Sequence, residues 1–261
     1  MRLRANLNVA VASARFQWLS IRTNPDYFLA LAMAPAFAIV FLSIVRHAGR
    51  SDLTTFALLA PVLISLWSMS INVSGELIAQ DRGYGTIEPL IATPAIYAVV
   101  LLGRIAAVSL LGLTSFIEVG LIGRFMFGVE LVISHPLVFI ATLIAAVFAM
   151  SGTSMILASV FVLGRSTRVF QQSLGYPFYV LGGVLVPVAN LPHWLQPFTK
   201  VVFLSWTSDL LRDACSPAHV DSALWRLSVV VALGAASMGF GVYLIDRVLT
   251  RVRGLGTMGF A

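Results

Sequence analysis

The chain has 261 residues, of which 59% are hydrophobic and only 11% are charged, against roughly 25% charged residues in a typical soluble domain. This composition excludes an ordinary water-soluble fold and predicts an integral membrane protein whose apolar side chains face lipid. The net charge of +6 is carried between apolar runs, as expected of topology signals and lipid headgroup contacts, so it does not indicate nucleic-acid binding.

Residues 1–25 form the first predicted element, a helix that lies in the membrane interface rather than across it. Apolar residues, Trp18 among them, recur at every third or fourth position, while Arg15 and Gln17 lie largely off that stripe; Arg4 belongs to the same helix. A helix with this pattern buries its apolar side among the lipids and directs its arginines to the headgroups. The alternative is a frayed basic arm. Pro25 marks the break before the next helix.

Six apolar runs follow, and each spanning helix needs about 20 predominantly apolar residues. The runs cover about residues 27–45, 56–78, 105–122, 137–163, 174–188 and 227–249. The fifth run is short and is interrupted by glycines and prolines. Ala30, Ala34 and Ala38 in the first run let another helix approach closely, either within the chain or from a second subunit.

The distribution of arginine orients these spans. With the N-terminus inside, eleven of the seventeen basic residues fall in cytoplasmic segments. Because positively charged residues are retained on the cytoplasmic side, we expect a multi-pass protein of the cytoplasmic membrane with both termini in the cytoplasm.

Residues 189–225, on the outer side, contain a further apolar piece that is too short and too interrupted to cross the membrane. We expect a re-entrant helical hairpin here, because non-helical backbone at membrane depth must be shielded by protein or water. Trp194 and Trp206 are expected to act as interfacial anchors. The predicted fold is one all-α membrane domain, residues 1–261, with six transmembrane helices, an N-terminal amphipathic interfacial helix and this hairpin between spans five and six.

The sequence lacks the motifs of common enzymes. It contains no GxxxxGK[ST] nucleotide-binding loop, no HExxH motif and no Gly-x-Ser-x-Gly elbow. Its four histidines do not have metal-ligand spacing. We therefore expect no catalytic residue and no metal site on this chain.

Residues 79–96, between the second and third spans, are the most informative segment. Charged residues end the second span, and two glycines then permit a sharp turn. A threonine can cap a short helix that has a glutamate and a proline in its first turn, and a Thr-Pro pair ends it. Such an exposed helix suits contact with a soluble partner. The residues of this predicted coupling segment are Asp81, Arg82, Gly85, Thr86, Ile87, Glu88, Thr93 and Pro94.

This segment resembles the permease subunits of type 2 ABC exporters. In that family, the second and third spans are joined by an acidic residue, a Gly-Thr-Leu-Glu-like run and a Thr-Pro pair. Here the run reads Gly85-Thr86-Ile87-Glu88, and Thr93-Pro94 follows it. A second similarity is a fifth span that ends in a proline and is followed by a leucine-proline-x-tryptophan-leucine pattern. Its residues here are Pro187, Pro192, Trp194 and Pro197, with Leu211-Arg212 at the end of the outer segment.

The resemblance implies a permease that forms half of a translocation pathway and is coupled to a separate ATPase. A complete pump would hold two permeases, identical or paralogous, and two ATPase subunits. ATP and Mg would bind the ATPase, so no cofactor is expected on this chain. The expected cargo is a drug-like or amphipathic molecule, as in multidrug or antibiotic efflux. Alternatives are lipid, glycan or peptide export within the family, or a secondary transporter that needs no ATPase.

Two polar residues within apolar runs, Glu118 and Asn72, are candidates for an intramembrane polar site. A buried acid is costly in lipid and often functional, although Glu118 lies six residues before Arg124 and a structural pair is the alternative. Asn72 either lines a pathway or joins helices. Arg82 and Arg104 are expected to pair with acids of the ATPase or to act as topology signals.

Overall fold

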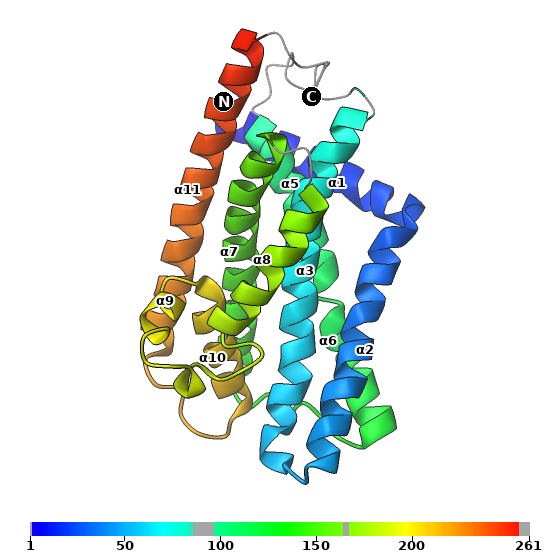
Figure 1. Cartoon of the computed structure of the whole chain (residues 1–261), viewed down its shortest axis with the longest axis vertical. Helices are drawn as coiled ribbons and strands as arrows, with labels where there is room; N and C mark the ends of the chain where they lie inside the picture. Colours follow the sequence, from blue (N-terminus) through cyan, green and yellow to red (C-terminus); the bar gives the residue numbers. More distant parts are fainter. Residues whose placement is uncertain (1, 84, 86–96, 164–166, 256–261) are drawn as a thin grey trace.

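The computed structural model describes residues 2–83, 85, 97–163 and 167–255 (Figure 1). These residues form helices and no strand, which confirms the predicted all-α class. The α-helices are α1 (Arg2–Thr23), α2 (Pro25–His47), α3 (Thr54–Gly83), α5 (Tyr97–Gly112), α6 (Ser115–Ile122), α7 (Pro136–Leu163), α8 (Thr167–Leu181), α9 (Gln196–Thr199), α10 (Phe203–Cys215) and α11 (Ala223–Leu255). The short helical turns are η1 (Ser51–Leu53), η2 (Gly123–Phe127) and η3 (Val188–Asn190).

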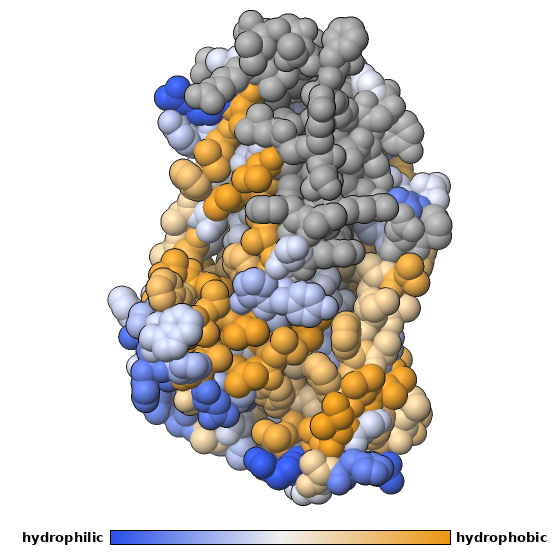
Figure 2. Space-filling view, in the orientation of Figure 1, coloured by the Kyte–Doolittle hydropathy of each residue, from blue (hydrophilic) through white to orange (hydrophobic). Residues whose placement is uncertain are grey.

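Five helical segments in the described part of the chain are long and apolar enough to cross a membrane. They are Tyr27–His47, Ser51–Ile71, Tyr97–Phe127, Pro136–Val160 and Ala223–Val248. Apolar side chains cover much of the surface in Figure 2, and Leu29, Leu137 and Ile144 are among the exposed ones. Because contiguous apolar surfaces of this extent are not stable in water, the chain is a multi-pass membrane protein.

The helix at the fifth apolar run differs from the prediction. The sequence predicts a span over residues 174–188, but α8 begins at Thr167 and ends at Leu181. Its 15 residues are fewer than the number that a membrane crossing needs, and α8 is not one of the five candidate segments. The helix ends because Gly183 has a φ of +63°, a left-handed conformation that favours glycine.

Helix α3 lies at the centre of the bundle and packs against α2, α5, α6, α7 and α8. Leu58, Leu63 and Trp67 on this helix are fully buried. The Trp67 ring stacks on Phe178 of α8, with 4.6 Å between the ring centroids. The central position of α3 therefore also fixes the position of α8.

The small residues of α2 form an internal packing face. Ala34 and Ala38 are fully buried in the same core as α3, and Ala30 is partly buried. Of the two alternatives that the sequence leaves open, the structure thus assigns these alanines to packing within the chain.

The third spanning segment is longer than predicted and is interrupted. It extends over Tyr97–Phe127 as α5, α6 and the π-helical turn η2, whereas the apolar run predicts residues 105–122. At the interruption, the Thr114 hydroxyl donates to the Leu111 carbonyl at 2.8 Å. The Ser115 hydroxyl pairs with that of Ser65 on α3 at 3.0 Å. These two bonds satisfy polar groups where the helix is broken within the bundle.

The two ends of the bundle carry different elements (Figure 1). Helix α1 runs across one end, where α3 and α11 finish and α5 begins, and this is called the α1 end. Helix α10 and the connection between α2 and α3 lie toward the opposite end, called the α10 end. Helix α8 runs from the α1 end toward the α10 end.

Candidate functional site

The described residues of the predicted coupling segment lie where α3 finishes, at the α1 end of the bundle. Helix α3 continues to Gly83, so Asp81 and Arg82 are in its last turn. Gly85 has a φ of +64°, consistent with the turn expected of a glycine there. The remaining residues of the predicted segment, Thr86, Ile87, Glu88, Thr93 and Pro94, lie outside the described residues.

At the same end of the bundle, α1 is held against α5 by buried polar contacts. Gln17 is 0% exposed and Arg104 is 4% exposed. The Arg104 Nε donates to the Gln17 Oε1 at 3.0 Å, and the Gln17 Nε2 donates to the Tyr27 hydroxyl at 2.9 Å. The guanidinium carbon of Arg104 also lies 5.6 Å from the centroid of the Phe16 ring. Three elements, α5, α1 and the start of α2, thus meet at the Gln17 amide.

A backbone contact reinforces this junction. A Cβ atom placed on Gly103 would collide with the Ala10 carbonyl oxygen, so only glycine fits there. The predictions for α1 are met in part. The helix is present and ends at Thr23, but Gln17, which falls off the apolar stripe and is expected with the headgroup-facing polar residues, faces α5 instead.

The other faces of α1 are free within the described chain. Arg4, Arg15 and Trp18 are exposed, as contact with headgroups requires. The location of this helix in the membrane interface stays a prediction.

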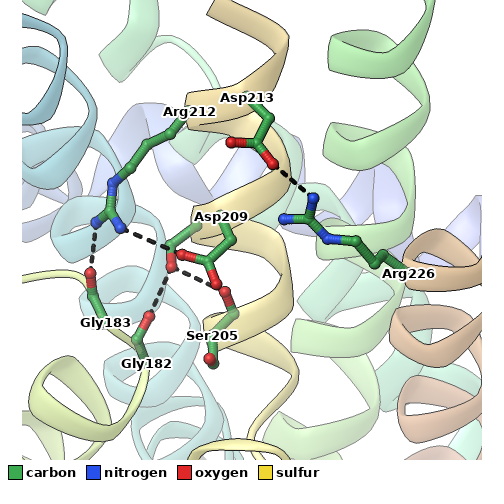
Figure 3. A network of polar contacts seen from close by, with 8 residues as sticks. Gly182, Gly183, Ser205, Asp209, Arg212, Asp213 and Arg226 are labelled. Atoms are coloured by element: carbon green, nitrogen blue, oxygen red, sulfur yellow. Dashed lines mark hydrogen bonds and ion pairs between the residues drawn. The ribbon is translucent and has the colours of Figure 1, made fainter. Parts of the chain in front are cut away.

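A second polar cluster lies at the α10 end, where α8 stops (Figure 3). Helix ends leave backbone carbonyls without partners, and here α10 supplies the partners. The Ser208 hydroxyl donates to the Gly182 carbonyl at 2.8 Å, and the Arg212 guanidinium donates to the Gly183 carbonyl. Arg212 also lies 4.5 Å from the centroid of the Phe56 ring on α3. One arginine therefore joins α10, α3 and the end of α8.

Two ion pairs continue this cluster. Arg212 is 3.4 Å from Asp209, and Arg226 of α11 is 2.5 Å from Asp213. Burial raises the pKa of Asp209 and lowers the pKa of Arg212, while the opposite charge of each works against these shifts. The attraction within the pair therefore offsets part of the cost of burying each charge. Sequence reasoning singled out Arg212 only as part of a family pattern. The acid-arginine spacing within α10, at 209, 212 and 213, is the signal that could have found the cluster.

The residues predicted for the outer hairpin lie between α8 and α10 but do not join this cluster. Pro187 precedes the turn η3, Pro192 accepts a backbone hydrogen bond from Leu195, and Pro197 is in the first turn of α9. Trp194 is 71% exposed.

The intramembrane polar candidates are not brought together into one site. The Glu118 Oε2 is buried and has no hydrogen-bond partner among the described residues. Arg124 forms an ion pair with Glu130 at 3.2 Å, so the alternative of a Glu118–Arg124 pair is not the arrangement found. Asn72 lies within α3, and its side chain is outside what the structure describes.

Hydroxyl groups also face one another between α3 and α8, and sequence reasoning did not pick them out. The Ser68 and Tyr179 hydroxyls are 2.5 Å apart. Tyr176, one turn earlier on α8, is exposed and packs edge-on against the Tyr179 ring, with 6.3 Å between centroids. Figure 2 shows a weakly hydrophilic patch at mid-height, with apolar residues below it. Ser68, Tyr176 and Tyr179 are together called the polar strip.

The family comparison covers the α1–α5 junction and all of α10. A model described as ABC-2 type transporter matches residues 9–215, from α1 to the end of α10. The search of curated proteins found no match. Because the matched segment is well over half of the chain, the chain belongs to the ABC-2 type transporter family.

Proposed function

We propose that this chain, as the membrane permease of an ATP-driven exporter, is coupled to ATPase subunits on separate chains. Family membership already makes the chain a transport permease. The observation that carries the proposal is the α1 end, where α3, the predicted segment 79–96 and α5 follow one another and α1 packs on α5. A soluble ATPase that pushes on this segment would act directly on the ends of two membrane helices. The sequence itself has no nucleotide-binding loop, so the ATP must be bound elsewhere.

The proposed topology has six crossings. Helix α7 ends at the α1 end and α11 begins at the α10 end, so the chain between them must traverse the bundle. Helix α8 is about 22 Å long at 1.5 Å per residue, and the residues after it complete the path. Residues 189–225 then form the outer re-entrant hairpin, with α10 packed on α7 and α11. Both termini lie in the cytoplasm of a cell-membrane protein.

The proposed cargo is a drug-like or amphipathic molecule. The polar strip formed by Ser68, Tyr176 and Tyr179 is supported by apolar neighbours, including the Trp67–Phe178 stack. A surface with a few hydroxyls among apolar side chains fits a molecule that has both polar and apolar groups. The complete pump contains a second permease, identical or paralogous, which supplies the other half of the pathway.

The experiment is purification of the tagged chain from its native membrane, followed by reconstitution into lipid vesicles. We expect a co-purified chain with a GxxxxGK[ST] loop and ATP-dependent movement of the amphipathic cation ethidium. The coupling variant changes Gly85 and Glu88 together to arginine, and it should hydrolyse ATP without moving ethidium. The control is the wild-type complex at equal expression.

The outcomes separate the candidate functions. If no ATPase is recovered, the proposal fails. Ethidium movement that follows a proton gradient without ATP would instead identify a secondary transporter. An ATPase that is recovered without ethidium transport rejects the proposed cargo and directs the assay to lipid, glycan or peptide substrates.

A further inference from the structure

The face of α1 that packs against the other helices has an unusual residue at its centre. Helices in membranes pack through small or apolar residues, and Ala10 and Ile21 on this face fit that description. Gln17, which is completely buried, does not. A buried amide is stable only when its donor and acceptor groups are satisfied, and Gln17 uses its Oε1 toward Arg104 and its Nε2 toward Tyr27.

The two hydrogen bonds of the Gln17 side chain connect it to two different helices. Arg104 is on α5, seven residues after the first residue of that helix, while Tyr27 is the third residue of α2. Both side chains are nearly inaccessible, so water cannot easily replace either bond. The Gln17 amide is therefore a bridge between the middle of α5 and the start of α2.

The Gly103–Ala10 contact gives the bridge a second fixed point. Ala10 and Gln17 are seven residues apart, which is about 10 Å along α1, and they contact the adjacent residues Gly103 and Arg104. Contacts at two separated points fix the crossing of the two helices. A displacement of α5 must then carry α1 with it, and α1 continues through Asn24 directly into α2.

We propose that Gln17 is a positioning residue that transmits movement of α5, through α1 and Tyr27, into the spanning helix α2. This inference rests on the proposed function, because the movement originates in the ATPase that pushes on residues 79–96. The transmission requires both hydrogen bonds of the Gln17 side chain.

Substitutions separate the hydrogen bonds from the volume of the side chain. Gln17→Leu keeps the size and removes both bonds. Gln17→Glu keeps them, because the carboxylate accepts from Arg104 and the Tyr27 hydroxyl can donate to it. Ser13→Ala is the matched control on the same face of α1, since among the described residues the Ser13 hydroxyl bonds only its own helix, at the Val9 carbonyl, at 2.8 Å.

The readout is a distance between spin labels on α2 and α11, which requires no knowledge of the substrate. Labels at the exposed positions Ile44 and Leu224 are introduced on a Cys215→Ser background, and labelled chains are diluted with unlabelled ones. The complex with its ATPase is compared without nucleotide and after trapping with Mg-ATP and vanadate. Wild type, Ser13→Ala and Gln17→Glu should show the same shift, and Gln17→Leu should lose at least half of it while hydrolysing ATP.

Each possible result of this experiment either supports or overturns the inference. A full shift in Gln17→Leu overturns the inference, as does a loss in Gln17→Glu equal to that in Gln17→Leu or the absence of any shift in wild type. If Gln17→Leu does not reach the membrane, Tyr27→Phe removes one end of the bridge, and an unchanged shift in that variant is equally decisive against it. Failure to recover an ATPase with the wild-type chain is a different result, because it overturns the proposed function itself.

Discussion

Gly152 of α7 and Gly234 of α11 meet backbone to backbone: a Cβ atom on Gly152 would lie 2.6 Å from the Gly234 carbonyl oxygen. A Cβ on Gly234 would in turn lie 2.8 Å from the Cα of Ala149. Small residues allow membrane helices to approach this closely, and the close approach maximises van der Waals contact where no hydrophobic driving force exists between helices. The pair therefore anchors α11 to the bundle.

Replacement of Gly234 by valine should separate these helices. The added side chain collides with the backbone of α7, which cannot yield as a flexible side chain can, and we expect a loss of about 1–3 kcal/mol. Thermal unfolding of the detergent-solubilised protein measures it. Gly239→Val is the control on the same helix, because nothing lies within 4 Å of a Cβ there. Equal melting temperatures for the two variants would refute the packing role of Gly234.

Arg212→Ala should destabilise the α10 end. The arginine side chain is 18% exposed and serves the Gly183 carbonyl, Asp209 and the Phe56 ring together. Its removal leaves a helix-terminal carbonyl and a carboxylate without their partner, which costs about 1–3 kcal/mol. Limited proteolysis of the 182–202 region should become faster.

Arg124→Ala is the matched control for that experiment. Arg124 also forms an ion pair, with Glu130, but its side chain is 67% exposed, and exposed pairs contribute little. If the two arginine variants unfold at the same temperature and are cleaved at the same rate, Arg212 contributes no more to stability than an arginine in an exposed ion pair.

Cys215 should resist alkylation in the folded protein. Burial of the thiol disfavours the charged thiolate and raises its pKa to about 11. Only about one thiol in 3,000 is then ionised at pH 7.5, and the thiolate is the reactive form. Iodoacetamide labelling should therefore be slow at pH 7.5 and become rapid in denaturant. In the folded protein, the labelling rate should rise about tenfold for each unit by which the pH is raised, up to about pH 11. An Ala218→Cys variant on a Cys215→Ser background provides an exposed comparison, and labelling of both cysteines at one rate would contradict the burial.

Composition and apolar runs were sufficient to predict the membrane class, the helical fold and approximate positions of five spanning segments. This follows from physics, because a backbone in lipid must satisfy its hydrogen bonds internally and long apolar helices do so. The end of α8 could not be predicted in the same way. It depends on Ser208 and Arg212, which reach the carbonyls of Gly182 and Gly183 from a helix 26 and 29 residues away in the chain.

The α1–α5 junction was hidden from sequence reasoning for a related reason. Gln17 is polar and lies off the apolar stripe of its helix, so periodicity places it toward headgroups. Its partner Arg104 is 87 residues away, and an arginine between apolar runs is normally interpreted as a topology signal. Only the fold brings Gln17 and Arg104 together. Because both side chains are buried, they join α1 to α5 and do not face lipid headgroups.

Gly85→Ala should weaken coupling at the α1 end by straining the turn after α3. Gly85 has a φ of +64° and open space around it, so the added methyl group meets no neighbour and acts only on the backbone. A left-handed conformation costs a non-glycine residue about 1–2 kcal/mol, and the turn will relax toward negative φ and redirect the predicted coupling segment. ATP hydrolysis by the complex should continue, while ethidium transport per ATP should fall severalfold.

Gly49→Ala provides a control with the same backbone strain. Gly49 has a φ of +65°, also with nothing within 4 Å of a Cβ, but it lies in the connection between α2 and α3 at the α10 end. Both variants should lose similar stability, and only Gly85→Ala should lose coupling. If transport per ATP falls equally in both, the effect is a general consequence of strain. If it falls in neither, the turn at Gly85 does not position the segment that receives force from the ATPase.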